Sequence, residues 1–265
     1  MTLIYKDLTY EIRKAIFYVH NHIGYGFDED VYHQGLKSHF KKLGIPFQSK
    51  HRETLVHREK AIATFEYDFL VTNLVILELK AIQSNFHPDH QRQILEYLKF
   101  WNKNLGLLIN FGFELVKIKR FPFEEKERKI DENYDHFKNV LDSQQRKEIA
   151  TIRDAVLDCY KIHGLGYGDR VYNEIIKVEF DHRNIEWKTD IEIPIYLDEL
   201  FIKNYKLPFL LVNGKYVVGI KALEDHISSY DVARTISYLR KLKLNLGLFL
   251  NFGRHALQIN GIFTK

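Results

Sequence analysis

The feature that most constrains the fold of this chain is an internal duplication. Residues 164–172 (GLGYGDRVY) repeat residues 24–32 (GYGFDEDVY), and residues 245–253 repeat residues 104–112. The offset drifts from 140 (24 to 164) to 141 (104 to 245), so the order is kept with one small gap. The repeat predicts two modules of the same fold, one in each half of the chain.

Composition places the chain among ordinary soluble globular proteins, with 45% hydrophobic and 28% charged residues. Its 265 residues are enough for two domains with separate cores. The net charge of +4 permits nucleic-acid binding without indicating it strongly. Cys159 is the only cysteine, which excludes an intramolecular disulfide. Because no signal peptide or membrane span is recognisable either, we expect a cytoplasmic protein.

Charged residues interrupt an apolar stretch at residues 68–80 (DFLVTNLVILELK), which predicts two strands joined by a short turn. Glu78 and Lys80 are two residues apart, so on a strand their side chains point to the same face. Burying a carboxylate or an ammonium group is costly unless the group is paired or binds a metal. Asp68, Glu78 and Lys80 on one sheet face therefore indicate a site for a divalent metal.

The turn between the two strands decides whether Asp68 and Glu78 share a face. A two-residue turn at Thr72 and Asn73 would pair Asp68 with Leu77 and direct Glu78 to the other side. A three-residue loop or a bulge is therefore required. Asn73 tolerates the left-handed backbone conformation that such a loop needs.

A less specific interpretation of Glu78 and Lys80 is a salt bridge at the end of a sheet. Only this pair lies in an apolar strand with an aspartate ten residues upstream. The same spacing also occurs at Glu124/Lys126, Glu127/Lys129 and Glu186/Lys188. On these residues alone both interpretations stay open.

Four ordered segments resemble the GxxExxY proteins, which are predicted members of the PD-(D/E)XK nuclease superfamily. Residues 26–32 match G-x-x-E-x-x-Y, and Asp68 with residues 78–80 matches the aspartate and E-x-K of the superfamily pattern. Residues 90–99 resemble H-x-x-Q-x-x-x-Y-L-K, and residues 106–111 match G-L-L-I-N-F. One departure is Glu66, where many relatives carry arginine. It puts in doubt any phosphate contact or charge balance that the arginine would supply.

The resemblance implies a nuclease that hydrolyses phosphodiester bonds with Mg²⁺ or Mn²⁺, with DNA as the favoured substrate and RNA as the alternative. Asp68 and Glu78 would bind the metal together with the carbonyl of Leu79. Glu29 would bind it through water or close a second site. Lys80 would orient or help to deprotonate the attacking water, or stabilise developing charge. The remaining residues that the resemblance places in the site, as supports or substrate contacts, are Gln93, Tyr97, Tyr32 and His90.

The second repeat keeps the pattern of the fold but not the chemistry. Lys80 corresponds to Lys221, whereas Glu78 corresponds to Gly219 and Gln93 to Arg234. The position of Asp68 is taken by Pro208 or Phe209, depending on the gap. Without these carboxylates the second repeat cannot hold a divalent cation in the same way. We therefore expect a catalytically inactive copy that acts as a pseudo-dimer partner or as a substrate-binding surface.

Hydrophobic periodicity predicts the elements of the first module. The expected helices span residues 5–22, 28–43 and 88–102, and the expected strands span 46–56, 61–71, 74–81, 105–111 and 114–120. This order suits an α/β fold with a mixed central sheet flanked by helices. We expect modules at residues 1–120 and 148–265. The charged connector 121–147 between them should include a helix that starts near Asp131.

Two alternatives to a nuclease remain. The first is a non-catalytic nucleic-acid-binding or scaffold protein of the same fold, because the degenerate second copy shows that the site residues can be lost. The second is a protein-interaction module, which a large apolar surface patch would favour. A further oligomer of the whole chain is compatible with each of them.

Overall fold

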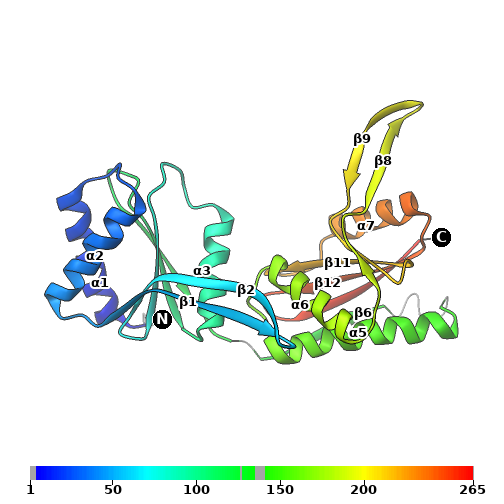
Figure 1. The fold of residues 1–265 in the computed structure, drawn as a ribbon, viewed down its shortest axis with the longest axis horizontal. Coiled ribbons are helices and arrows are strands. Elements are labelled where there is room, and N and C mark those ends of the chain that lie inside the picture. Colours follow the sequence, from blue (N-terminus) through cyan, green and yellow to red (C-terminus); the bar gives the residue numbers. More distant parts are fainter. Residues whose placement is uncertain (1–3, 126, 135–140, 265) are drawn as a thin grey trace. The chain divides into compact units, whose positions relative to one another are not determined.

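The computed structural model describes residues 4–125, 127–134 and 141–264 and divides into two compact units (Figure 1). The first unit contains the chain up to Leu55 and from Ala63 to Glu125. The second contains Val56–Ile62 and the chain after Glu125. Within the described residues, no helix combines the length and the apolar character needed to cross a membrane.

The first unit has a five-stranded sheet in the order β1-β2-β3-β4-β5. Strands β3 and β4 are parallel, whereas β2/β3 and β4/β5 are antiparallel, so the sheet is mixed. Its elements are α1 (Lys6–Ile23), α2 (Glu29–Leu43), β1 (Phe47–His57), β2 (Lys60–Val71), β3 (Val75–Lys80), α3 (Pro88–Phe100), β4 (Leu105–Asn110) and β5 (Lys117–Pro122).

Helices cover both faces of this sheet. Helices α1 and α2 bury their apolar sides against one face, where Leu77 and Leu79 of β3 join the same core. Helix α3 lies on the other face, and a side chain at Gly106 would come within 2.7 Å of Ile94. Because alternate residues of a strand point to opposite faces, Glu78 and Lys80 project toward the α3 side.

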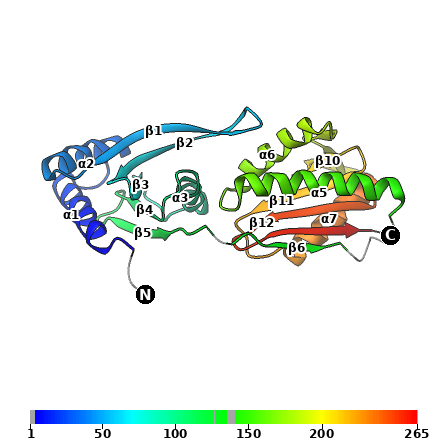
Figure 2. The ribbon, with the colours of Figure 1, turned by 90° about the horizontal axis from the view of Figure 1, so that it is seen from below.

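The second unit repeats this arrangement around a six-stranded mixed sheet in the order β6-β13-β12-β11-β10-β7. Figure 2 shows α5 and α6 along one face of the sheet and α7 on the other. Its elements are β6 (Ile130–Asn133), α5 (Ser143–His163), α6 (Asp169–His182), β7 (Trp187–Lys188), β8 (Glu192–Leu197), β9 (Leu200–Lys206), β10 (Leu210–Val212), β11 (Tyr216–Ala222), α7 (Ser229–Leu242), β12 (Leu246–Phe252) and β13 (Leu257–Phe263).

The predicted fold class, two α/β modules with mixed sheets flanked by helices, is confirmed. The hairpins differ between the units. In the first unit β1 and β2 both belong to the main sheet, whereas in the second unit β8 and β9 form a separate two-stranded sheet. A register shift between Ile195 and Tyr196 interrupts β8.

The helix predicted near Asp131 is wrong. Residues 130–133 form β6, which pairs in parallel with the edge strand β13 through Ile130 and Leu257. The residues of β6 are all exposed and have no apolar face that would stabilise a helix. They pair instead with the free edge of β13. The next helix begins at Ser143, where Asp142 and Gln145 form a capping box. Residues 135–140 of the predicted connector lie outside the described residues.

Candidate active site

Asp68 and Glu78 share one face of the first sheet because of the loop between β2 and β3. Val71 pairs with Val75, so residues 72–74 form a three-residue loop. Two of its residues adopt the left-handed conformation, with φ of 50° and 59°. The predicted loop length is confirmed, and continuing the register sets Asp68 opposite Glu78.

The carboxylate of Asp68 is 3% exposed and is held by two donors. Its Oδ2 accepts a hydrogen bond of 2.6 Å from the backbone N–H of Leu79. Its Oδ1 forms an ion pair with the ammonium group of Lys50 on β1. These contacts fix the carboxylate beside the strand that carries Glu78 and Lys80.

Glu78 is also 3% exposed. Its Oε1 accepts a hydrogen bond of 2.6 Å from Nζ of Lys80, whereas its buried Oε2 has no hydrogen-bond partner among the residues that the structure describes. Burial, followed by repulsion from Asp68, raises the pKa of Glu78 to about 8. A buried carboxylate with one unsatisfied oxygen is therefore the least compensated group of the site.

Lys80 bridges Glu78 and Glu29. Its Nζ lies 4.0 Å from Oε2 of Glu29, which is the first residue of α2. Burial lowers the pKa of Lys80, but the two carboxylates outweigh burial and raise it overall. Burial raises the pKa of Glu29, with attraction to Lys80 opposing and repulsion from Asp68 adding to the rise. Three carboxylates thus surround one lysine.

Helix α3 places three of the predicted residues beside this cluster. Nε2 of Gln93 donates a hydrogen bond of 2.6 Å to the hydroxyl of Tyr97. Burial and the nearby charge of Glu78 raise the pKa of Tyr97. Burial and the nearby charge of Lys80 lower the pKa of His90. Nδ1 of His90 accepts from the backbone N–H of His87 in a capping box, which leaves Nε2 for other partners.

The substrate role expected for Tyr32 does not fit its position. The side chain is fully buried, and its hydroxyl donates to the carbonyl of Gly24 at 3.0 Å. Its ring stacks on Phe111 at 4.4 Å. Tyr172 makes the same contacts in the second unit, with Gly164 at 2.8 Å. The tyrosine of this motif therefore anchors the loop that leads into the helix, which is a structural task common to both units.

Two contributors were not assigned a place in the site from the sequence. Asn110 at the end of β4 is fully buried, and its side chain bonds the backbone N–H and carbonyl of Ile82 at 3.0 and 2.9 Å. It thereby holds the segment that follows Lys80. The other contributor is Lys50, whose pairing with Asp68 depends on packing between the neighbouring strands β1 and β2. Glu66 takes Arg52 as its partner at 2.9 Å.

The second unit has apolar residues where the first has carboxylates. Leu210 pairs with Val218, so the same register sets Phe209 opposite Gly219. This register places Phe209, rather than Pro208, at the position of Asp68. A side chain at Gly219 would come within 2.7 Å of the ring of Phe249. No carboxylate fits at this point of the second sheet without moving that ring.

Lys221 has a different counterion from its equivalent Lys80. Its Nζ lies 3.0 Å from Oδ2 of Asp231 on α7, which also accepts a hydrogen bond of 2.6 Å from the hydroxyl of Ser228. Burial opposes ionisation of Asp231, but the bonds from Ser228 and Lys221 lower its pKa overall. Arg234 lies 3.7 Å from the other oxygen of Asp231.

A cavity of about 540 Å³ opens beside these residues. Four cationic side chains line it, against two carboxylates. The charged lining residues are Lys177, Lys206, Lys221, Arg234, Asp169 and Asp190. More basic than acidic side chains therefore line the position that corresponds to the first site. Each of the four cations has an acidic partner: Lys177 pairs with Glu174, Lys206 with Asp190, and both Lys221 and Arg234 with Asp231.

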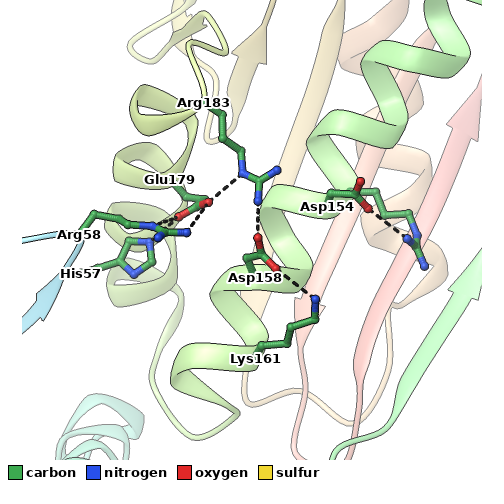
Figure 3. A network of polar contacts seen from close by, with 8 residues as sticks. His57, Arg58, Asp154, Asp158, Lys161, Glu179 and Arg183 are labelled. Atoms are coloured by element: carbon green, nitrogen blue, oxygen red, sulfur yellow. Dashed lines mark hydrogen bonds and ion pairs between the residues drawn. The ribbon is translucent and has the colours of Figure 1, made fainter.

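A second buried cluster of ionisable groups belongs to the second unit (Figure 3). In the part of the chain that the structure describes, His57, Cys159 and Glu179 are the one trio of possible metal ligands within 4.8 Å of one another. Glu179 is fully buried and accepts hydrogen bonds from Arg58, Arg183 and His57. Burial alone would raise its pKa, but these donors lower it to about 2. Because two guanidinium groups already satisfy the carboxylate, the cluster is an ion-pair network and not a cation site.

Comparison with known proteins supports the duplication. The family model described as the PD-(D/E)XK nuclease superfamily matches residues 6–121 and again residues 146–261. A search of curated proteins gave no significant match. The solved structure titled "Crystal structure of SSO0001" is 18% identical, with a TM-score of 0.30. That match covers 36% of this chain and 50% of the other, so the chain spans half the length of that relative.

The two family matches together cover most of the 265 residues, and each falls on one of the repeated sets of helices and strands. The chain therefore belongs to the PD-(D/E)XK nuclease superfamily and carries two copies of the domain.

Proposed function

We propose that the first unit is a metal-dependent nuclease that hydrolyses phosphodiester bonds, with DNA as its substrate. The observation that carries the proposal is the unpartnered Oε2 of Glu78, buried beside Asp68. Such a group lowers its free energy by binding a cation. Membership of the nuclease superfamily supports the same conclusion.

The donor set fits a hard divalent cation such as Mg²⁺ or Mn²⁺. Asp68 and Glu78 would hold the ion, with the carbonyl of Leu79 as a further oxygen and Glu29 as a ligand through water. When bound, the ion would polarise the phosphoryl group and lower the pKa of a bound water.

The protein's own residues would orient and stabilise the reacting groups. Lys80 would direct its ammonium group at the phosphoryl oxygens and stabilise the charge that develops there. The hydrogen bond from Gln93 to Tyr97 would fix both side chains beside the substrate. Nε2 of His90 would donate to a phosphate oxygen.

We infer that the second unit binds the phosphate backbone without hydrolysing it. Its pocket offers Lys177, Lys206, Lys221 and Arg234, all of which suit phosphate oxygens. Lysine and arginine there need no metal to bind an anion. Replacement of Gln93 by Arg234 adds a bidentate donor at the corresponding position.

One observation favours the alternative of a non-catalytic nucleic-acid-binding protein. Lys50 pairs with Asp68, and Lys80 pairs with Glu78, so each carboxylate already has a lysine. A cation would have to displace these contacts. Metal binding therefore separates the two candidate functions.

The experiment is cleavage of single- and double-stranded DNA and RNA with Mn²⁺ and with Mg²⁺, comparing wild type with Lys80→Ala. We expect cleavage of DNA by wild type and its loss in the variant. A companion measurement is thermal stabilisation by Mn²⁺, which Glu78→Gln should abolish and the exposed control Glu186→Gln should retain. Equal cleavage by both proteins, or no cleavage and no stabilisation by metal, would support the binding protein instead.

A further inference from the structure

The hairpin β8–β9 exposes large apolar side chains at its tip. Leu197 and Leu200 are 64% and 63% exposed, and Tyr196 is 53% exposed. Leu197 pairs with Leu200 across a turn of two acidic residues, Asp198 and Glu199. A two-stranded hairpin is only marginally stable alone, and clustered exposed apolar residues mark contact surfaces.

The equivalent hairpin of the first repeat has a tip that is covered at one residue. An offset of 140 aligns His57 with Leu197 and Lys60 with Leu200. Both hairpins turn through two residues, Arg58 and Glu59 in the first case. His57 is only 2% exposed, whereas Leu197 is 64% exposed. The first tip is therefore covered at His57, although Arg58, Glu59 and Lys60 stay exposed, whereas all four residues of the second tip, 197–200, are exposed among the described residues.

Helix α6 in the second unit shows what covers the first tip. Glu179 accepts hydrogen bonds from Arg58 and His57 (Figure 3), and Asp181 lies 3.5 Å from the ammonium group of Lys60. Basic residues of the β1–β2 tip thus contact acidic residues near the C-terminal end of α6. The same offset of 140 identifies the equivalent surface in the first unit, at the C-terminal end of α2.

The summed charge of that equivalent surface has the opposite sign. Asp181 corresponds to Lys41 and His182 to Lys42, whereas Glu179 corresponds to His39 and Arg183 to the uncharged Leu43. This basic surface would complement the acidic turn of β8–β9. Reversal on both sides preserves the attraction between tip and surface.

The equivalent surface also offers exposed apolar and aromatic groups. Leu43 is 47% exposed and Tyr18 of α1 is 41% exposed. The ring of Tyr18 stacks between His22 and His39, with centroids 3.9 and 4.0 Å away. An apolar tip with two leucines would bury against such a surface.

We propose that copies of this chain associate by docking the β8–β9 tip of one copy on the α1/α2 face of another. The tip comprises Tyr196, Leu197, Asp198, Glu199 and Leu200. The α1/α2 face comprises Tyr18, His22, His39, Lys41, Lys42 and Leu43. The acidic turn repels nucleic acid and anionic lipid. The tip of the first repeat packs on the end of α6, so we expect the second tip to dock in the same way on the equivalent helix end of another copy. The association is independent of catalysis.

The first test is the molar mass of the full chain by sedimentation equilibrium over a range of concentrations. We expect masses above the monomer mass of 31.6 kDa. The double variant Leu197→Ser/Leu200→Ser should increase the dissociation constant roughly ten-fold or more, because two apolar anchors are lost. Tyr230→Ser, an equally exposed aromatic of α7 outside both surfaces, should leave it unchanged. A wild type that stays monomeric at every concentration overturns the proposal.

Charge reversal tests which surfaces meet. Asp198→Lys/Glu199→Lys and Lys41→Glu/Lys42→Glu should each abolish self-association, because tip and face then carry the same charge. Mixing the two variants should restore association, since each tip then meets a face of opposite charge. Restoration is not expected if the substitutions merely damage the fold. Failure of the mixture to associate, while each variant remains folded, contradicts the proposed pairing.

Cysteine cross-linking distinguishes contact between chains from contact within one chain. The single native cysteine, Cys159, is fully buried and does not interfere. Oxidation of Leu197→Cys/Leu43→Cys should give a disulfide-linked species of at least twice the monomer mass, and Leu197→Cys/Tyr230→Cys should not. A disulfide confined to one chain would place the tip on its own α1/α2 face and overturn association with a second copy.

Discussion

The same point of the fold carries buried charge in the first unit and apolar packing in the second. Asp68 and Glu78 face each other across β2 and β3, both 3% exposed. In the second unit Phe209 and Gly219 take these positions, and the ring of Phe249 fills the space beside Gly219. The fold itself therefore does not need the carboxylates, and their cost in the first unit calls for a functional reason.

The retained lysines add to this comparison. Lys80 pairs with Glu78 on its own strand, whereas Lys221 pairs with Asp231 on α7. Asp231 occupies the same helix position as His90, the third residue of the first turn. The helix therefore supplies the counterion in the second unit and the strand supplies it in the first, because a half-buried lysine needs a counterion.

Removal of Glu179 should produce the largest change in stability. Glu179→Ala leaves Arg58, Arg183 and His57 without their shared carboxylate and should cost about 3–5 kcal/mol. The equivalent change in the first unit, His39→Ala, should cost less than about 1 kcal/mol. Urea denaturation followed by Trp187 fluorescence in a Trp101→Phe background reports the second unit. Equal costs at the two positions would contradict the distinction between a covered and an open tip.

Glu78 should make the first unit less stable as the pH rises. Its folded-state pKa is raised from 4.5 to about 8, so the folded state holds its proton more tightly than the unfolded state. The resulting stability is present below pH 4.5 and is lost as the pH rises through 8.

Metal-free wild type should therefore lose stability relative to Glu78→Gln between pH 5 and 8.5. The difference is at most several kcal/mol, because each pKa unit is worth about 1.4 kcal/mol. Urea denaturation followed by Trp101 fluorescence in a Trp187→Phe background measures it. Addition of Mn²⁺ at pH 8.5 should restore the wild type only. Parallel pH profiles of the two proteins would show that the buried carboxylate is not destabilising.

Arg234 should contribute to nucleic-acid binding in the absence of metal. Arg234→Gln, which recreates the residue of the first unit, should weaken DNA binding several-fold and reduce the salt slope by about 1. Fluorescence anisotropy in EDTA measures both quantities, with the exposed Arg240→Gln as a control. An unchanged salt slope would remove the second pocket from the binding surface.

The smallest expected effect concerns the tyrosines that both units share. Tyr32→Phe and Tyr172→Phe should each cost about 1 kcal/mol, because each removes a hydrogen bond to a glycine carbonyl and a long one from a backbone N–H. The two tryptophan backgrounds described above measure each unit separately. A large loss of turnover with little loss of stability in Tyr32→Phe would assign this tyrosine to catalysis after all.

Local pattern predicted the fold and the carboxylate pair well. The need for a three-residue loop or a bulge follows from strand alternation, because a regular two-residue turn would direct Asp68 and Glu78 to opposite faces. The helices near Glu29 and Gln93 follow from apolar periodicity and from the glycine that ends α2. These features depend on neighbours in the sequence, so they can be predicted without the packing.

The partners of the charged groups could not be predicted in this way. Lys50 reaches Asp68 from the neighbouring strand, and Asp231 reaches Lys221 from a helix on the sheet face. Glu179 and His57 are 122 residues apart, and Glu179 looks like an ordinary charged helix residue in the sequence. The strand at residues 130–133 was missed because it pairs with the edge of β13, which is more than 120 residues away in the sequence.

The most direct test of the central claim is the cleavage rate of wild type, Lys80→Ala and Lys221→Ala on one DNA substrate in Mn²⁺, with folding of each protein confirmed by circular dichroism. Removing a group that stabilises the transition state should reduce turnover in Lys80→Ala on the order of 100-fold or more. Lys221→Ala should stay within about two-fold of wild type, because removing one surface phosphate contact changes binding more than chemistry. A comparable loss of turnover in Lys221→Ala, or full activity in Lys80→Ala, would contradict the assignment of catalysis to the first unit.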